Sequence, residues 1–291
     1  MPGFQTIGVI TKQSDPRLAD TLQTLLDFLA SRSLKVLVDE SAASLLKAEA
    51  AELVSRERLA RDADLAIVVG GDGTLLNAGR SLADADVPVL GINLGRLGFL
   101  VDVSPEEMTA RIDEILNGDY REARRFLLDA EVIRGNKVIG RAVALNDVVL
   151  HVRDVVRMIE FDTYIDDHFV NTQRADGLVV STPTGSTAYA LSGGGPILHP
   201  ALDAIVLVPV CPHTLSHRPI VVKGDSRIEI RVCAHNKDPA QVSFDGQANI
   251  DLEPEDRIVI AKKPGPLRLL HPKGHDYFHI LRAKLRWGEQ P

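Results

Sequence analysis

The chain has 291 residues, of which 45% are hydrophobic and 25% charged, and its formal net charge at pH 7 is -7. This is ordinary globular composition, and the length favours two domains over one large core. The acidic balance, without a basic block interleaved with aromatic residues, argues against nucleic-acid binding, which needs Lys and Arg to neutralise phosphates.

The N-terminal segment MPGFQTIGVITKQ lacks the basic flank and the apolar run of a signal peptide. No stretch approaches the ~20 apolar residues of a membrane helix. The two cysteines, Cys211 and Cys233, do not amount to a disulfide framework. We therefore expect a cytoplasmic protein with reduced thiols and no membrane partner.

The first part of the chain alternates apolar runs with amphipathic stretches. Strands are expected over residues 6–11, 34–38, 65–69 and 87–92. Helices are expected from a proline-marked start at residues 14–16, and over residues 42–58 and 105–116. This alternation indicates a parallel, doubly wound sheet, so residues 1–120 are predicted to form an α/β nucleotide-binding domain.

After about residue 119 short β-rich runs dominate, and Gly135-Asn136 and Asp245-Gly246 mark hairpins. We expect residues 121–275 to form a β-rich, sandwich-like domain. Residues 276–291 carry apolar side chains at helical spacing, and are predicted to form a C-terminal helix that returns to the first domain.

Residues 65–82, LAIVVGGDGTLLNAGRSL, read as strand, glycine-rich turn and helix. Glycines let the backbone approach a ligand closely and adopt positive φ, and a helix start directs free N–H groups at a phosphate. Asp72 is unusual in such a turn, because a carboxylate repels phosphate. It suits a catalytic role, accepting the proton of an attacking hydroxyl. An alternative is a simple helix cap.

The chain lacks the two commoner phosphate loops. The first strand leads into Lys12-Gln13 rather than a G-x-G-x-x-G turn, and no G-x-x-x-x-G-K-[ST] occurs. GGDGTLL followed by GINLGRLGFL resembles the NAD kinase family. GGDGT alone is shared with diacylglycerol and sphingosine kinases and resembles the phosphofructokinase loop. The later segments ALNDVVLHV and RADGLVVSTPTGSTAYALSGGGP extend the resemblance over nearly the whole chain.

The resemblance implies a set of site residues. Asp72 would be catalytic within the phosphate loop, whose other members are Gly70, Gly71, Gly73 and Thr74. Asn146 and Asp147 would hold a ribose, with Asp147 as an alternative base, and Asp176 would bind the nicotinamide carboxamide. The dinucleotide pocket would be lined by Thr187, Ala188, Tyr189, Ala190, Leu191 and Ser192. Phosphate or nucleotide contacts are assigned to Arg157, Arg174 and Gln247.

Metal ligation by protein side chains is not expected. Cys211-x-His213 and Cys233-x-His235 have spacings narrower than structural zinc sites prefer. His275 and His279 follow Pro272 and Gly274, so a surface or capping role is predicted for them. Phosphoryl transfer from ATP nevertheless needs Mg²⁺, which phosphates and water can hold with few protein ligands.

The resemblance therefore implies an ATP- and Mg²⁺-dependent NAD kinase that phosphorylates the 2′-hydroxyl of the adenosine ribose of NAD to give NADP. It also implies a homodimer or homotetramer. Two alternatives stay open: a lipid kinase that shares GGDGT, and a non-catalytic protein that senses NAD or NADP.

Overall fold

The computed structural model describes residues 3–12, 18–46, 51–95, 97–153, 158–214, 216–236 and 238–287. The chain divides into two compact units. Unit 1 comprises Met1–Arg124 and Leu267–Pro291, and unit 2 comprises Arg125–Pro266. The chain thus completes most of unit 1, builds unit 2 as one insertion, and then returns.

Within the described residues, unit 1 contains a seven-stranded sheet. Its strands are β1 (Thr6–Thr11), β2 (Lys35–Asp39), β3 (Glu52–Val54), β4 (Leu65–Val69), β5 (Val89–Ile92), β6 (Tyr120–Arg125) and β19 (Leu267–Pro272). They lie in the order β3-β2-β1-β4-β5-β19-β6, and the pairs from β3 to β19 are parallel.

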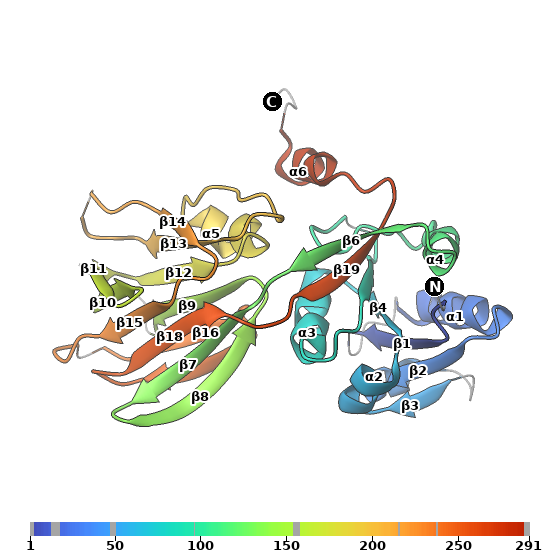
Figure 1. Ribbon diagram of the computed structural model, residues 1–291, viewed down its shortest axis with the longest axis horizontal. Coiled ribbons are helices and arrows are strands. Elements are labelled where there is room, and N and C mark those ends of the chain that lie inside the picture. Colours follow the sequence, from blue (N-terminus) through green and yellow to red (C-terminus); the bar gives the residue numbers. More distant parts are fainter. Residues whose placement is uncertain are drawn as a thin grey trace. The chain divides into compact units, whose positions relative to one another are not determined.

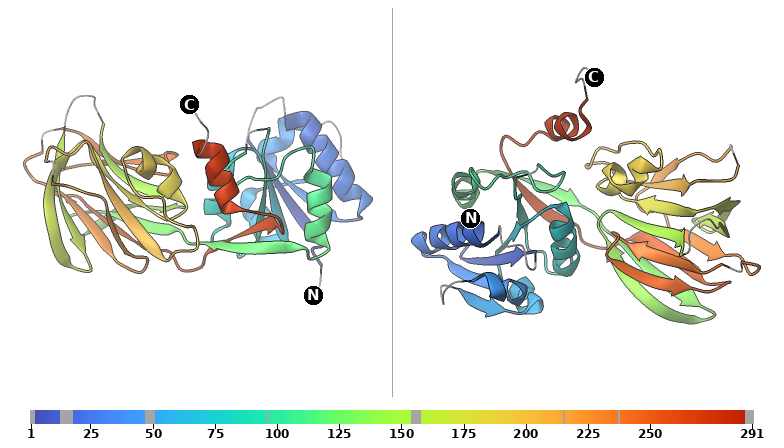
Figure 2. Two further views of the ribbon diagram at one scale, coloured as in Figure 1. Left: turned by 90° about the horizontal axis from the view of Figure 1, so that it is seen from above. Right: turned by 180° about the vertical axis from the view of Figure 1, so that it is seen from behind.

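The helices of unit 1 are α1 (Leu18–Ser31), η1 (Glu40–Leu45, a 3-10 helix), α2 (Arg56–Asp62), α3 (Asp72–Leu82), α4 (Met108–Leu116) and α6 (Tyr277–Leu285). Helices α1 and α4 contact each other on one face of the sheet, and α2 and α3 contact each other on the opposite face (Figure 1 and Figure 2). With both faces covered, β4 is apolar and fully buried along its whole length. The predicted doubly wound α/β unit is confirmed.

The expected helix over residues 42–58 is wrong. Asp39 accepts a hydrogen bond from the Ser41 backbone N–H at 3.0 Å and another from Arg56 Nε at 2.6 Å, and η1 starts there. Strand β3 then pairs with β2, and Ser55 caps α2. Side-chain caps and strand pairing compete with a helix here, and helical periodicity does not reveal either. The expected helix start at residues 14–16 lies outside the described residues.

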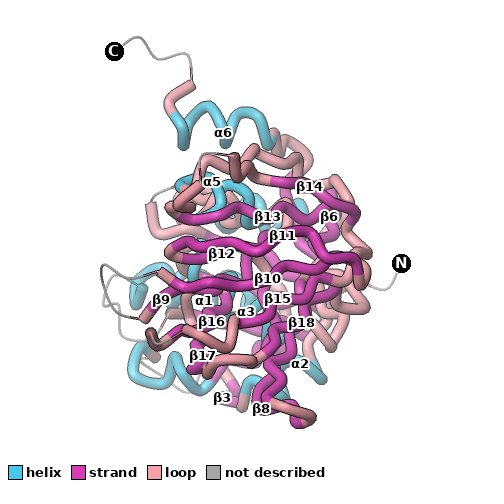
Figure 3. The backbone as a smooth tube through the Cα atoms, turned by 90° about the vertical axis from the view of Figure 1, so that its left-hand side faces the viewer, coloured by secondary structure: helices cyan, strands magenta, loops and turns pink. Residues whose placement is uncertain are grey.

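Within the described residues, unit 2 contains two six-stranded antiparallel sheets. Its elements are β7 (Leu128–Arg134), β8 (Lys137–Ala144), β9 (Asp147–Val152), β10 (Ile159–Ile165), β11 (His168–Ala175), β12 (Gly177–Ser181), η2 (Gly185–Thr187), α5 (Tyr189–Ser192), β13 (Ala204–Val210), β14 (Ile220–Lys223), β15 (Ile228–Val232), β16 (Ala240–Phe244), β17 (Ala248–Leu252) and β18 (Arg257–Lys262). The sheet orders are β11-β10-β15-β18-β7-β8 and β14-β13-β12-β9-β16-β17. Strands make up most of this unit (Figure 3), which confirms the predicted sandwich-like domain.

Strand alternation divides β9 between two environments. Val148 and Leu150 point into the apolar core that the two sheets share. Val149 points to the other face, where a second apolar cluster includes Ala190 of α5. Because successive side chains point to opposite faces, Asp147 and His151 belong to the Val149 face. That face carries the candidate site.

The structural division differs in position from the expected boundaries at residues 120 and 275. The return to unit 1 begins at Leu267, because β19 joins the sheet beside β5, with Leu269 opposite Val89. Helix α6 follows, with the Asp276 carboxylate capping it by accepting from the Phe278 N–H. No helix in the described part of the chain is long and apolar enough to cross a membrane.

Candidate functional site

The glycine loop connects β4 to α3. Gly71 is the N-cap of α3, and Asp72 is the first helical residue, two positions earlier than the expected start near Thr74. Gly71 and Gly73 are exposed, so the loop lies at the surface of unit 1. The first-turn N–H groups and the helix dipole then favour an anion.

Gly70 is needed in this loop for space rather than for positive φ. None of Gly70, Gly71 or Gly73 is among the residues with positive φ, so that expectation is wrong. A Cβ at Gly70 would lie 2.5 Å from Thr74 Oγ1. At this position the loop packs against the first turn of its own helix and only glycine fits, whereas a Cβ at Gly71 would meet nothing within 4 Å.

The Asp72 carboxylate is tied to a distant part of the motif. It accepts hydrogen bonds from the backbone N–H groups of Phe99 and Leu100, each at 2.9 Å, and of Val101 at 3.3 Å. A Cβ at Gly98 would lie 2.3 Å from Asp72 Oδ1. The segments GGDGT and LGFL are therefore two halves of one structure, with the Asp72 side chain between them.

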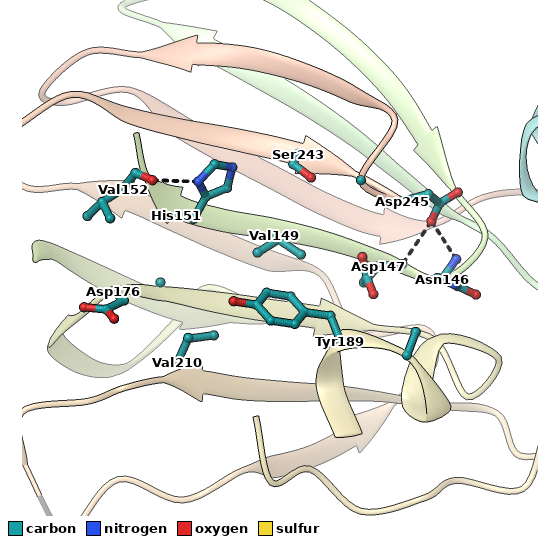
Figure 4. A pocket seen from close by; sticks show the side chains of 13 residues that line it. Asn146, Asp147, Val149, His151, Val152, Asp176, Tyr189, Val210, Ser243 and Asp245 are labelled. Carbon is teal, nitrogen blue, oxygen red and sulfur yellow. Dashed lines mark hydrogen bonds between the residues drawn. The ribbon is translucent and has the colours of Figure 1, made fainter. Parts of the chain in front are cut away.

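Unit 2 has a pocket of about 570 Å³ on the Val149 face of β9 (Figure 4). Its lining comes from β9, β12, β13, β16 and the start of α5. The lining residues are Asn146, Asp147, Val149, His151, Val152, Asp176, Gly177, Ala188, Tyr189, Val210, Ser243, Asp245 and Gly246.

Five of the residues predicted for the dinucleotide line this pocket: Asn146, Asp147, Asp176, Ala188 and Tyr189. The others lie elsewhere, as follows. Thr187, Leu191 and Ser192 flank the lining residues in η2 and α5, and Ala190 is buried in the apolar cluster behind them. Gln247 is exposed in the β16–β17 turn, and Arg174 is exposed on β11 of the other sheet. Arg157 lies outside the described residues.

Asp245 is a site residue that the sequence analysis missed. Its carboxylate accepts the backbone N–H groups of Leu145 at 3.0 Å, Asn146 at 2.8 Å and Asp147 at 3.1 Å. Its own N–H donates to the Asp147 carbonyl at 3.0 Å. Figure 4 shows this carboxylate directed at the start of β9. The Asp245-Gly246 hairpin signal in the sequence predicts a turn and not this contact.

The other side of the Asn146 backbone is fixed by the end of β12 and the turn after it. The N–H of Thr182 donates to the Asn146 carbonyl at 2.9 Å, and the Ser181 hydroxyl donates to the same oxygen at 3.1 Å. A Cβ at Gly185 would lie 2.2 Å from that carbonyl oxygen. The Asn146-Asp147 pair therefore stands on a rigid backbone, which is what precise ligand contacts require.

Asp147 has an unusual environment for an acid. Its side chain is buried, and burial followed by the charge of Asp245 raises its pKa to about 7. At neutral pH the carboxyl is divided between its two forms. It can donate a hydrogen bond when protonated and accept a proton when ionised.

The rest of the pocket combines apolar walls with single polar groups. Val149, Val152 and Val210 offer flat apolar surface, and the ring of Tyr189 is 46% exposed beside them. Such surfaces suit a planar aromatic ligand. Asp176 accepts a hydrogen bond from the thiol of Cys211, and this bond raises the pKa of that thiol.

The cysteine–histidine pairs do not assemble a metal site in the described part of the chain. Burial, with the charges of Asp162 and Glu160, raises the pKa of Cys233 to about 11, so its thiol is protonated at neutral pH. The group of potential ligands that the described residues do bring together is Asp102, His271 and His275. His275 is only 13% exposed and binds Asp102, which corrects its expected surface or capping role.

Comparison with known proteins agrees with this arrangement. Residues 7–120 match the ATP-NAD kinase N-terminal domain, and residues 145–271 match the ATP-NAD kinase C-terminal domain. The NAD kinase of Nitrosococcus oceani is 53% identical over 287 residues, which are 99% of this chain and 98% of that protein. The NAD kinase of Chromohalobacter salexigens is 51% identical over 290 residues, covering 100% and 99%.

Two solved structures share the fold. A yeast NADH kinase complexed with NADH superposes with a TM-score of 0.91 at 25% identity, covering 100% of this chain and 90% of that one. An NAD kinase from Archaeoglobus fulgidus in complex with ATP superposes with a TM-score of 0.77 at 26% identity, covering 97% and 98%. Since identity of about one half extends over the full length of its relatives, the chain is a phosphotransferase that belongs to the NAD kinase family.

Proposed function

We propose that the phosphoryl group of ATP is transferred at the Gly70–Thr74 loop to the 2′-hydroxyl of NAD, whose adenosine ribose is held by Asn146 and Asp147. The observation that carries this proposal is the rigid Asn146-Asp147 pair in the unit 2 pocket. The yeast relative was solved with NADH and the Archaeoglobus relative with ATP. Both ligand classes are therefore compatible with this fold.

The charge of the pocket determines which part of NAD it suits. Its described lining includes Asp147, Asp176 and Asp245 but no Lys or Arg. A pyrophosphate would be repelled there, whereas a ribose and a base present neutral hydroxyls and amides. We therefore assign the nucleoside parts of NAD to the pocket. Phosphate contacts are assigned to side chains outside it, for which Arg157 and Arg174 stay the candidates.

Four of the polar lining residues are assigned a matching group on the ligand. The Asn146 amide offers a donor and an acceptor, and Asp147 meets the ribose hydroxyls. The Asp176 carboxylate is assigned to the nicotinamide carboxamide. Tyr189, with Ala188 beside it, offers a ring face for stacking. The remaining residues of the 187–192 segment support these contacts from behind.

Mg²⁺ fits the chemistry of the loop. A magnesium ion bound with ATP can be held by the phosphates and by waters, with few protein ligands. When bound, such an ion offsets charge on the transferred phosphoryl group. The exposed backbone at Gly71 and Gly73, together with the start of α3, adds positive potential for the same phosphates.

The proton of the 2′-hydroxyl must pass to a carboxylate while its oxygen attacks the γ-phosphorus and the bond to ADP breaks. Asp72 is our assignment for this base. Its carboxylate has about four lone-pair sites, of which three accept the N–H groups of Phe99, Leu100 and Val101. One site stays available to a substrate hydroxyl, and the bound N–H groups fix its direction. Asp147 is the alternative base, because a pKa of about 7 matches the pH at which it would act.

The test measures NADP after mixing the purified chain with ATP, Mg²⁺ and NAD. Asp72→Asn should lower turnover about 100-fold or more while the Kd for NAD stays near that of the unmodified chain. Asp86→Asn is the matched control, because Asp86 is an exposed turn residue of the same unit. Near-normal turnover in Asp72→Asn would remove Asp72 from the base role. No NADP with any phosphoryl donor would favour the sensing function instead.

Three further properties stay proposals. The family resemblance implies a homo-oligomer, which sedimentation equilibrium measures directly. The cytoplasm is proposed as the location, and fractionation of cells that carry a tagged chain tests it. ATP rather than polyphosphate is the proposed donor, and parallel assays with both compounds compare them.

A further inference from the structure

A second cluster of chemically active side chains lies in unit 1, apart from the residues assigned above. It consists of Asp102, His271 and His275. Strands β4, β5 and β19 are parallel, so their carboxyl ends share one edge of the sheet. His271 is near the end of β19, and Val103, beside Asp102, forms a bridge with Ile92 at the end of β5. The cluster therefore lies at the sheet edge where α/β proteins bind ligands.

The two imidazoles converge on one carboxylate oxygen. His271 Nδ1 lies 3.2 Å and His275 Nδ1 lies 2.5 Å from Asp102 Oδ2. The two rings are stacked, with centroids 3.8 Å apart and planes inclined by 22°. Each of the three residues offers a ligand atom, and these atoms all lie within 4.8 Å of one another.

We propose that Asp102, His271 and His275 form a binding site for a divalent transition metal of the zinc class. A tetrahedral ion about 2.0 Å from each ligand holds the ligand atoms about 3.3 Å apart. The His271–Asp102 distance already has this value, and the His275–Asp102 distance would open by less than about 1 Å. Two imidazoles and one carboxylate are donors that zinc, nickel and cobalt accept, whereas Mg²⁺ prefers oxygen alone.

The burial of the cluster argues for a ligand beyond the protein itself. The Asp102 side chain is only 10% exposed, and its Oδ1 atom has no hydrogen-bond partner among the described residues. A buried carboxylate oxygen without a partner is costly. An ion that neutralises the carboxylate, together with the water it brings, reduces that cost.

Access and an open coordination position come from a neighbouring cavity of about 430 Å³. Asp102 and His275 line it, together with Glu107, Asp276 and His279. Three protein ligands leave a fourth position for water, which this cavity can supply. The wall carries the acidic side chains of Glu107 and Asp276, together with the Arg111 guanidinium that is ion-paired with Glu107 at 3.3 Å.

Occupancy would have a consequence within unit 1. Asp102 directly follows the Phe99–Val101 backbone that holds the Asp72 carboxylate, and His275 directly precedes the N-cap of α6. The ion would cross-link these two segments and the end of β19. We expect saturating Zn²⁺ to raise the unfolding temperature by roughly 5 °C, because only the folded chain presents the three ligands together.

Isothermal titration of the chelator-treated, nucleotide-free chain with Zn²⁺ tests the site. One equivalent should bind, and His275→Gln should weaken binding by about 100-fold or more. His168→Gln is the matched control, because His168 is an exposed histidine of unit 2. A tightly bound equivalent that His275→Gln removes and His168→Gln retains would support the site. No binding, or equal binding by His275→Gln, would overturn it.

A second measurement needs no variant, in case His275→Gln folds poorly. Imidazole ¹⁵N resonances of the unmodified chain should shift at His271 and His275 on addition of Zn²⁺. Shifts confined to other histidines would refute the assignment. Because neither readout uses turnover, a failure here is distinguishable from a failure of the proposed kinase mechanism.

Discussion

The buried carboxyl of Asp147 makes a stability prediction that is independent of catalysis. Its pKa is 3.8 when unperturbed and about 7 in the folded chain. Below pH 3.8 the group is protonated in both the folded and the unfolded state and costs nothing. As pH rises toward 7, the unfolded chain releases the proton and the folded chain keeps it, so stability falls. Above about pH 7 the carboxyl is ionised in both states, and the folding stability falls no further.

The difference between 3.8 and about 7 corresponds to about 4 kcal/mol of lost stability at pH 8. At pH 5 the same group costs about 2 kcal/mol. Asn has nearly the same shape as protonated Asp but does not titrate. Asp147→Asn should therefore be more stable than the unmodified chain, and the margin should grow by about 2–3 kcal/mol between pH 5 and pH 8.

Urea unfolding of both proteins at the two pH values, followed by circular dichroism, measures this margin. Asp167→Asn is the control, since Asp167 is highly exposed in a turn of the same unit, with a positive φ that Asn tolerates. Carboxyl ¹³C titration of Asp147 gives its pKa directly. A margin that is the same at pH 5 and pH 8, or a titration midpoint near 4, would refute the reasoning.

Two further substitutions test the frame around the pocket. Asp245→Asn removes one of the two oxygens that accept three backbone N–H groups, and it removes a charge beside Asp147. We expect the KM for NAD to rise about 10- to 100-fold and the pKa of Asp147 to fall below 7. Asp251→Asn is the control, and an unchanged KM in Asp245→Asn would contradict the prediction. Gly185→Ala places a Cβ against the Asn146 backbone carbonyl, so we expect the free energy of unfolding measured in urea to fall by about 1–3 kcal/mol and NAD binding to weaken. Gly3→Ala is the control and should change neither quantity, because a Cβ at Gly3 meets no atom within 4 Å. A Gly185→Ala chain of normal stability would contradict the close approach.

A segment was predicted correctly where one requirement determines its conformation, and wrongly where several interactions compete. Strand β4 was predicted to the residue, because apolar character is the only requirement of a strand buried on both faces. The region of residues 42–58 failed because Asp39, Ser41 and Ser55 redirect the backbone through side-chain hydrogen bonds. Strand β19 was missed because it follows Pro264 and Pro266 and joins a sheet whose other strands lie far earlier in the chain.

The residues of the site also differ in how far they could be predicted from the sequence. Asn146 and Asp147 could be singled out from a motif, and the structure places both in the lining of the unit 2 pocket. Asp245 acts on them from about 100 residues away, through backbone N–H groups that carry no side-chain signature. The cluster of Asp102, His271 and His275 was equally hidden. Its members become neighbours only because β19 returns to lie beside β5.

The two carboxylates that compete for the role of base differ in what surrounds them. Asp72 is the first residue of α3 and its carboxylate accepts three backbone N–H groups, so its position is defined. Asp147 is buried beside another acid and changes protonation state near neutral pH. A fixed carboxylate suits a base that also aligns the hydroxyl with the phosphoryl group, whereas a carboxyl with a pKa of about 7 suits a base whose protonation state changes near neutral pH. The two assignments therefore separate in experiment: loss of Asp72 should lower turnover at every pH, and loss of Asp147 should remove any rate dependence centred near pH 7.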